Sequence, residues 1–349
     1  MKIPETVSGI PKRGNLSAAT KILSMLSRFP EGVPQSYLAK ALGLSKSYLS
    51  ILLRDLERQG LVYRVRVGNS LIVKLAGFRG VNTTGGRVLR VGIVWSSEYL
   101  FLGHFAKILR DRESVEVKIK TYPSALQTIL ALIRGEVDAV ISPLVTQIYG
   151  YIVSKSLAIV GGGAKGGGYV YEIPRSYSDT ITSSEMSTMD LCRLLAIRNS
   201  IVDTASTRYF SSAEEAVAMA RRGVARYAVV WHPINIDIEL SGGRRIASCA
   251  DFDEISHCCT LAVSRVLGYE AIEKIASIYR DSIEAFAKDR ERFLDWYSAT
   301  VGIDVPILRK ALDEYIFDPE LSPKQFSRIV EALGLDVPDR SSIYGAIRF

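Results

Sequence analysis

Six glycines lie in the stretch LAIVGGGAKGGGYVYE, which spans residues 157–172. Three of them, Gly161, Gly163 and Gly166, fit the pattern G-x-G-x-x-G, which is typical of loops that bind a dinucleotide pyrophosphate. Such a loop needs a helix directly after the glycines, because the amides of the helix N-terminus meet the phosphates. Here YVYEIP follows, which is typical of a strand ended by proline. We therefore predict no dinucleotide site and no cofactor.

A second group with chemically capable side chains is the run His257–Cys258–Cys259, with Cys249 upstream. Zinc sites usually pair their ligands at C-x-x-C spacing, and neighbours on a strand point to opposite faces. Because CCTLAVS is typical of a strand, we interpret these cysteines as buried structural thiols and predict no metal site. A redox-sensing thiol pair remains an alternative.

The remaining residues contain no recognisable catalytic motif. Only three histidines occur, and neither H-E-x-x-H nor a nucleophile triad is present. We therefore predict that the chain is not an enzyme.

Positive charge is concentrated in the first quarter of the chain. Residues 1–87 hold 14 Lys and Arg against 4 Asp and Glu, whereas the remainder holds 30 against 33. Such asymmetry predicts a basic module that meets a polyanion, joined to a body with a different role. Without an apolar stretch of about 20 residues for a membrane span, or a signal-peptide core, we expect a cytoplasmic protein whose four cysteines, Cys192 included, are reduced.

The basic quarter predicts three helices and a hairpin. The first helix covers residues 17–29 with a cap at Ser17, the second begins at Pro34, and the third covers residues 45–59. Two β-type runs, LVYRVRV and SLIVKLA, follow and join at Gly68–Asn69, which is a hairpin signal.

This order, with the stretch ALGLSKSYLSILLRDLERQGLV, resembles the winged helix-turn-helix of prokaryotic transcription regulators over residues 16–76. The resemblance implies that the third helix enters the major groove of operator DNA while the hairpin contacts its backbone. The side chains expected at double-stranded DNA are Lys46, Ser47, Tyr48, Ser50, Arg54, Arg64, Arg66 and Lys74. A three-helix domain that binds protein through a solvated basic face is the alternative.

We expect three parts: a DNA-binding domain at 1–76, a glycine-rich linker at 77–87 and a ligand-sensing body at 88–349. In the body, buried-strand patterns alternate with amphipathic helices, which predicts an α/β fold with a parallel sheet. Two stretches, ALQTILALIRGEVDAVISPL and AEEAVAMARRGVARYAVVWHP, repeat one order of helix, glycine, strand and proline. We therefore expect two similar lobes.

The body resembles the type II periplasmic solute-binding fold over residues 88–338, in particular the group that binds nitrate, sulfonates, taurine and thiamine-pyrimidine precursors. The resemblance rests on Gly135–Ala139, the strand-to-glycine run at 157–168, Val230–Pro233 and the long helical C-terminus. It implies that the effector binds in a cleft between two lobes. The effector is expected to be anionic, zwitterionic or heterocyclic.

By their positions at strand ends and helix starts, sixteen residues are expected at this ligand, with the glycines allowing close approach of backbone to ligand. They are Trp95, Ser96, Ser97, Tyr99, Tyr122, Ser124, Ser142, Gly162, Gly163, Gly167, Ser183, Ser184, Ser187, Thr188, Trp231 and His232.

The leading hypothesis is a ligand-responsive transcription regulator that acts as a homodimer or higher homo-oligomer on a palindromic operator. The alternative is an enzyme similar to pyrimidine-precursor synthases, with a DNA-binding domain that regulates its own operon. A DNA-binding architectural protein with a ligand-free body is the third hypothesis.

Overall fold

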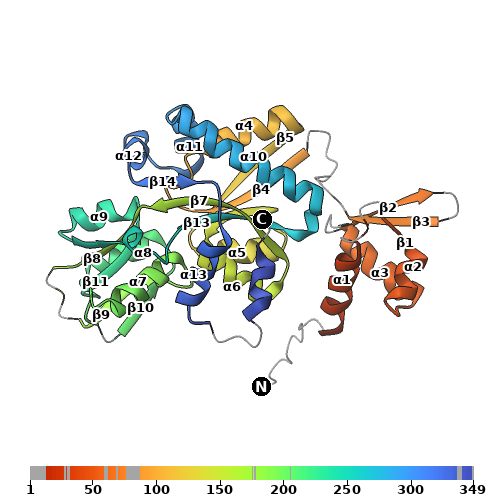
Figure 1. The fold of residues 1–349 in the computed structure, drawn as a ribbon, viewed down its shortest axis with the longest axis horizontal. Coiled ribbons are helices and arrows are strands. Elements are labelled where there is room, and N and C mark those ends of the chain that lie inside the picture. Colours follow the sequence, from red (N-terminus) through yellow and green to blue (C-terminus); the bar gives the residue numbers. More distant parts are fainter. Residues whose placement is uncertain are drawn as a thin grey trace, which may run out of the picture. The chain divides into compact units, whose positions relative to one another are not determined.

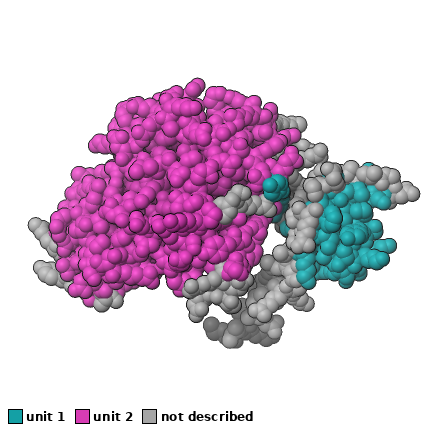
Figure 2. Space-filling view, viewed as in Figure 1, with its two compact units in different colours: residues 1–82, 266–269 teal, residues 83–265, 270–349 magenta. Residues whose placement is uncertain are grey.

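The computed structural model divides the chain into two compact units, Met1–Asn82 with Val266–Tyr269, and Thr83–Arg265 with Glu270–Phe349 (Figure 2). The residues that it describes are 13–26, 29, 32–58, 62–67, 70–75, 87–174, 176, 178–204, 206–335 and 340–347. Of the predicted linker, residues 77–86 lie outside the described residues, and the predicted domain boundaries stay a prediction.

The first unit consists of three helices and a three-stranded sheet. Its elements are α1 (Arg13–Leu26), β1 (Val33–Pro34), α2 (Gln35–Ala41), α3 (Lys46–Arg58), β2 (Val62–Val67) and β3 (Ser70–Leu75), with sheet order β1-β3-β2. The leucine stripe of α3 packs into one core, where Leu49 and Leu53 are fully buried against Ile22 and Leu38.

Three local predictions for this unit can be compared with the structure. The hydroxyl of Ser45 accepts a hydrogen bond from Tyr48 N at 3.2 Å, as expected of a helix cap. The predicted cap at Ser17 is wrong, because α1 begins at Arg13 and Ser17 lies inside it. The hairpin is confirmed, since β2 and β3 pair antiparallel with Val67 opposite Ser70; the turn residues themselves lie outside the described residues.

The second unit contains two lobes, each built on its own sheet (Figure 1). The strands of the first lobe are β4 (Arg87–Val94), β5 (Val115–Tyr122), β6 (Ala139–Pro143), β7 (Leu157–Gly166), β13 (Cys259–Ser264) and β14 (Tyr315–Asp318). Its helices are α4 (Leu102–Glu113), α5 (Ala125–Ile133), α6 (Leu144–Ser154), α10 (Tyr269–Lys288), α11 (Leu294–Val301), α12 (Val305–Ala311) and α13 (Pro323–Ala332).

The second lobe holds the strands β8 (Gly168–Glu172), β9 (Thr180–Ser184), β10 (Ser206–Phe210), β11 (Tyr227–Trp231) and β12 (Arg244–Ser248). Its helices are α7 (Thr188–Arg198), α8 (Ala213–Arg221) and α9 (Ile234–Leu240). The sheet orders are β14-β7-β13-β6-β4-β5 and β10-β9-β11-β8-β12.

Both sheets share one plan. Three parallel strands, β5-β4-β6 in one lobe and β10-β9-β11 in the other, are followed by an antiparallel strand that arrives from the opposite lobe, β13 or β8. The expectation of a parallel sheet is therefore corrected to two mixed sheets, because the chain crosses between the lobes twice. The two echoing stretches become α5–β6 and α8–β11, in matching places, which confirms the expected similarity of the lobes.

The glycines at 161–168 lie where the chain first passes from one lobe to the other, at the end of β7 and the start of β8. Strand β8 follows them, which confirms the predicted strand and leaves no helix N-terminus for a pyrophosphate. Packing within the sheet gives two of these glycines a structural role, and their expected close approach to a ligand stays a prediction. A Cβ on Gly163 would lie 2.0 Å from the carbonyl oxygen of Cys259, and one on Gly162 would lie 2.2 Å from that of Asp318. Glycine is required here because β7 packs tightly between β13 and β14.

The state of the cysteines is also corrected. Cys192 on α7 and Cys249 after β12 form a disulfide with their Cα atoms 5.4 Å apart, so only Cys258 and Cys259 are free thiols. Composition alone does not reveal this pair, because 57 residues separate the two in sequence. Among the described residues, no helix has the length and hydropathy to cross a membrane.

Candidate DNA-binding surface and ligand cleft

Helix α3 exposes polar and basic side chains on the first unit. Lys46, Ser47 and Arg54 are exposed, and Ser50 is partly exposed. Tyr48 is half-buried and packs against the core, so its ring helps to hold the helix in place. This helix therefore exposes cations and hydroxyls, and it is the helix that the resemblance to winged-helix regulators implies would enter a DNA groove.

The basic residues of the hairpin differ in their surroundings. Arg64 donates two hydrogen bonds to the Glu57 carboxylate, at 2.6 and 2.8 Å, and only 19% of its side chain is exposed. This pairing raises the pKa of Arg64. Arg66 is exposed on β2, and Lys74 is partly exposed on β3. Arg64 thus fastens the hairpin to α3, and Arg66 is the more accessible cation for a phosphate.

In the second unit, one cavity lies between the lobes. Its walls are Val94, Ser96, Glu98, Tyr99, Ala125, Pro143, Ser184, Ser187, Thr188, Met189, Trp231, Cys258 and Cys259. The cavity has a volume of ≈ 20 Å³, which is about enough for one ordered water. The lobes are therefore nearly closed on each other.

Six of the sixteen residues predicted at the ligand line this cavity: Ser96, Tyr99, Ser184, Ser187, Thr188 and Trp231. Trp95 instead lines an open groove with α8 and α9, where its neighbours include Arg221 and Asp237. Ser124 caps α5 by accepting from Gln127 N at 3.3 Å. The remaining predicted residues are buried and are not among the residues that line this cavity: Ser97, Tyr122, Ser142, Gly162, Gly163, Gly167, Ser183 and His232.

Hydrogen bonds across the cleft hold the lobes together. The Ser97 hydroxyl and His232 Nδ1 are 2.5 Å apart, and Trp231 Nε1 donates to the carbonyl oxygen of Trp95 at 2.9 Å. Tyr315 donates to the His232 carbonyl oxygen at 3.4 Å. Because each of these hydrogen bonds joins one lobe to the other, together they stabilise the closed arrangement.

Acid should weaken this closure through His232. Burial lowers the pKa of His232, an effect that Arg245 and Lys310 reinforce and that Glu314 and Glu239 oppose. The unfolded imidazole then takes up a proton more readily than the folded one, so stability falls as pH drops below about 6.5. We expect the acid-induced fall in melting temperature to be shallower in His232→Asn than in wild type, measured by calorimetry from about pH 7 to about pH 5. Equal slopes would contradict this role. His104→Asn gives the change expected from a buried histidine outside the cleft, because the pKa of His104 is also lowered by burial but its ring contacts the Asp289 carbonyl oxygen.

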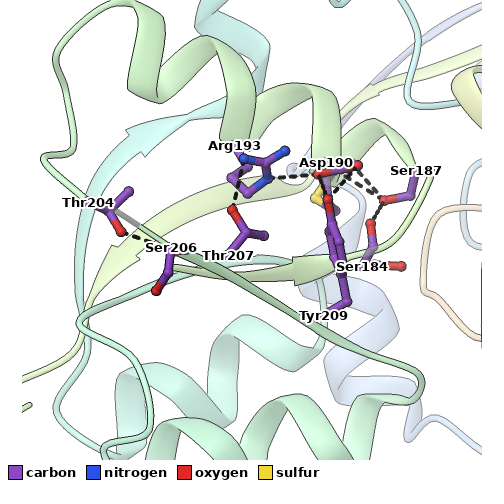
Figure 3. Close-up of polar contacts among 9 residues, drawn as sticks. Ser184, Ser187, Asp190, Arg193, Thr204, Ser206, Thr207 and Tyr209 are labelled. Atoms are coloured by element: carbon purple, nitrogen blue, oxygen red, sulfur yellow. Dashed lines mark hydrogen bonds and ion pairs between the residues drawn. The ribbon is translucent and has the colours of Figure 1, made fainter. Parts of the chain in front are cut away.

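Ser187 and Thr188, at the start of α7, line the cavity. The polar groups in this first turn already have hydrogen-bond partners (Figure 3). The Ser187 hydroxyl accepts from the amides of Met189 and Asp190 at 3.1 and 3.3 Å. The Asp190 carboxylate lies in the first turn, paired with Arg193 at 2.7 Å and accepting from the Tyr209 hydroxyl at 3.1 Å. The positive end of the helix dipole therefore already faces a carboxylate and a hydroxyl.

Glu98 is a cavity residue that the sequence reading missed. It is only 3% exposed, and one carboxylate oxygen accepts from Cys259 N at 3.0 Å. Burial raises its pKa to about 7. No Lys, Arg or His occurs among the described residues that line this cavity. The available signal was a lone charged residue, in WSSEYLFL, between a buried strand and an apolar helix.

Cys258 and Cys259 face the same cavity, against expectation. Strand alternation predicted opposite directions, but β13 begins at Cys259, so Cys258 lies in the crossing before the strand. Their sulfur atoms are 3.9 Å apart, and the Tyr99 hydroxyl lies 3.2 Å from Cys259 Sγ. Burial raises the pKa of the Cys259 thiol well above its usual value.

Comparison with known proteins agrees with both units. Residues 17–70 match the model of the MarR family. No curated protein sequence matches the chain.

Three solved structures show the fold of the remainder. The alkanesulfonate-binding protein SsuA from Xanthomonas axonopodis pv. citri has a TM-score of 0.61 at 16% identity, covering 76% of this chain and 99% of that one. The aliphatic sulphonate-binding protein SsuA from Escherichia coli has a TM-score of 0.60 at 16% identity, covering 75% and 92%. The ligand-binding component of an ABC-type import system from Staphylococcus aureus has a TM-score of 0.59 at 14% identity, covering 71% and 91%. The chain therefore joins a MarR-family winged-helix domain at residues 17–70 to a two-lobed unit with the fold of periplasmic substrate-binding proteins.

Proposed function

We propose that this chain is a ligand-responsive transcription regulator. The winged helix binds operator DNA through α3 and the β2–β3 hairpin, and a small molecule that binds between the lobes changes operator affinity. Because the closed cavity of ≈ 20 Å³ holds only about one water, the lobes must move apart to admit this molecule. The observation that carries the proposal is the presence, on one chain, of a MarR-family domain and a two-lobed binding fold with a cavity between its lobes.

The chemistry of the cavity supports a neutral or cationic effector with hydrogen-bond donors. Glu98 is its buried ionisable carboxylate, and the lining offers no cationic side chain to an anion. The α7 amides that would otherwise attract an anion are taken by Ser187. Trp231 and Tyr99 supply aromatic surface, which suits a heterocycle. Of the three effector classes expected from the sequence, we therefore favour the heterocyclic one over the anionic one.

The surroundings of the thiols favour binding over catalysis. A nucleophilic cysteine needs a lowered pKa. Burial instead raises the pKa of Cys259, and the pKa of Cys258 is raised as well. We accordingly propose a regulator that is not an enzyme, that works in the compartment holding DNA, the cytoplasm, and that binds a palindromic operator as a homodimer or higher homo-oligomer.

The test is fluorescence anisotropy with the DNA upstream of the chain's own gene, titrated with and without a panel of aminopyrimidines, amines and alkanesulfonates. We expect affinity for this DNA to exceed that for scrambled DNA by about a thousandfold, the usual scale for specific binding. At least one nitrogen heterocycle of the panel should change the affinity for this DNA. Equal affinity for both DNAs would refute operator binding; specific binding indifferent to every cleft ligand would refute sensing.

A further inference from the structure

We propose that Glu98, Cys258 and Cys259 form a binding site for one thiophilic divalent metal ion of the zinc class, in the wall of the cavity between the lobes. The inference goes beyond the proposed regulation and does not depend on it.

The geometry of the three side chains matches a metal centre. One ligand atom from each, a carboxylate oxygen and two sulfurs, lies within 4.8 Å of the other two. The two sulfurs are 3.9 Å apart, close to the about 3.8 Å edge of a tetrahedron whose zinc–sulfur bonds are about 2.3 Å long. Small rotations of the side chains would therefore bring all three atoms to bonding distance of one ion.

Neighbouring groups already hold the three ligands in place. Cys259 N donates to one oxygen of Glu98, which leaves the other oxygen for a metal. The Tyr99 hydroxyl lies against Cys259 Sγ, where it can donate to a thiolate. Thr188 Oγ1 donates to the Cys258 carbonyl oxygen at 2.8 Å and fixes the backbone there. Outer contacts of this kind orient ligands in known metal sites.

The donor atoms of the site suit a cation. Three acidic groups share a wall whose described residues include no Lys, Arg or His. Binding of M²⁺ by two thiols and a carboxylic acid would release three protons and leave one negative charge. Two sulfurs and one oxygen select zinc or cadmium over magnesium and calcium, which prefer oxygen ligands alone.

The cavity provides the fourth coordination position. Its ≈ 20 Å³ of space adjoins the three ligands and Ser96, enough for about one water. Three protein ligands plus an open position are typical of zinc sites that exchange a ligand. A water or a donor atom of an effector would therefore complete the coordination.

The test uses the full chain, reduced, freed of metal with EDTA and desalted without oxygen. Titration with CdCl₂ should produce the ultraviolet sulfur-to-cadmium charge-transfer band and saturate at one ion per chain. Cys258→Ser/Cys259→Ser should abolish the band. Glu98→Gln should keep it but weaken Cd²⁺ binding by about tenfold or more, at least the loss that follows when an outer partner of a ligand is changed.

Two controls separate this site from other metal-binding side chains. Cys192→Ser/Cys249→Ser removes the other cysteine pair and should leave the band unchanged. His257→Gln should also leave it unchanged, because the His257 ring contacts the Asp318 carbonyl oxygen at 3.2 Å instead of the cavity. Folding of each variant is checked by circular dichroism.

The proposal is overturned if folded wild type shows no band, if the band survives Cys258→Ser/Cys259→Ser, or if mass spectrometry shows that Cys258 and Cys259 bond to each other under the reducing conditions used. Because no DNA is present, failure here leaves the proposed regulation intact.

Discussion

Replacing Gly163 with alanine is expected to destabilise the two-lobed unit severely. The new Cβ would lie 2.0 Å from the carbonyl oxygen of Cys259, and the neighbouring strand cannot retreat because β7 is held between β13 and β14. We expect a loss of at least about 3 kcal/mol in the free energy of unfolding, or no soluble protein at all. Chemical denaturation measures the loss.

The matched control is Gly302→Ala. Gly302 has a φ of 73° and open space where a Cβ would go, so alanine there suffers conformational strain without a clash. The expected loss is about 1 kcal/mol. If both variants lose the same amount, the close packing of the glycine strand is not what requires glycine at position 163.

Removing the exposed cations of α3 is expected to cost most of the DNA affinity. Lys46→Ala/Arg54→Ala should weaken binding to every DNA sequence by about tenfold or more. The slope of log affinity against log salt concentration should fall by about two units, because two fewer phosphate contacts release two fewer counterions. Both side chains are exposed at the helix that resembles a major-groove reader. Anisotropy titrations at low and at physiological salt measure affinity and slope together.

Arg64→Ala is the informative comparison. Its guanidinium already pairs with Glu57, so the salt dependence should change little while the winged-helix domain loses stability. We expect Lys46 and Arg54 to contact DNA and Arg64 to support the domain. A decrease of one unit in the salt-dependence slope of Arg64→Ala, or an unchanged slope in Lys46→Ala/Arg54→Ala, would contradict these roles.

The sequence alone determined the order of elements and both fold types. Helix and strand periods, the Ser45 cap and the two echoing stretches are local patterns, so they can be recognised without knowledge of the tertiary structure. The strand after the glycines was predictable for the same reason: YVYEIP carries a strand pattern whatever surrounds it.

The composition of the site depended on tertiary structure. Glu98 is one charged residue in an apolar segment, and only the folded chain buries it beside two cysteines about 160 residues later. The disulfide of Cys192 with Cys249 likewise joins residues that no spacing rule connects.

Local patterns thus determined which segments form which elements, because backbone preference and burial period act over a few residues. The three-dimensional arrangement was needed to learn what the glycines pack against and that Arg64 is paired with Glu57. It was also needed to bring Glu98 beside Cys258 and Cys259. These depend on through-space neighbours, and two crossings between the lobes bring distant parts of the chain together.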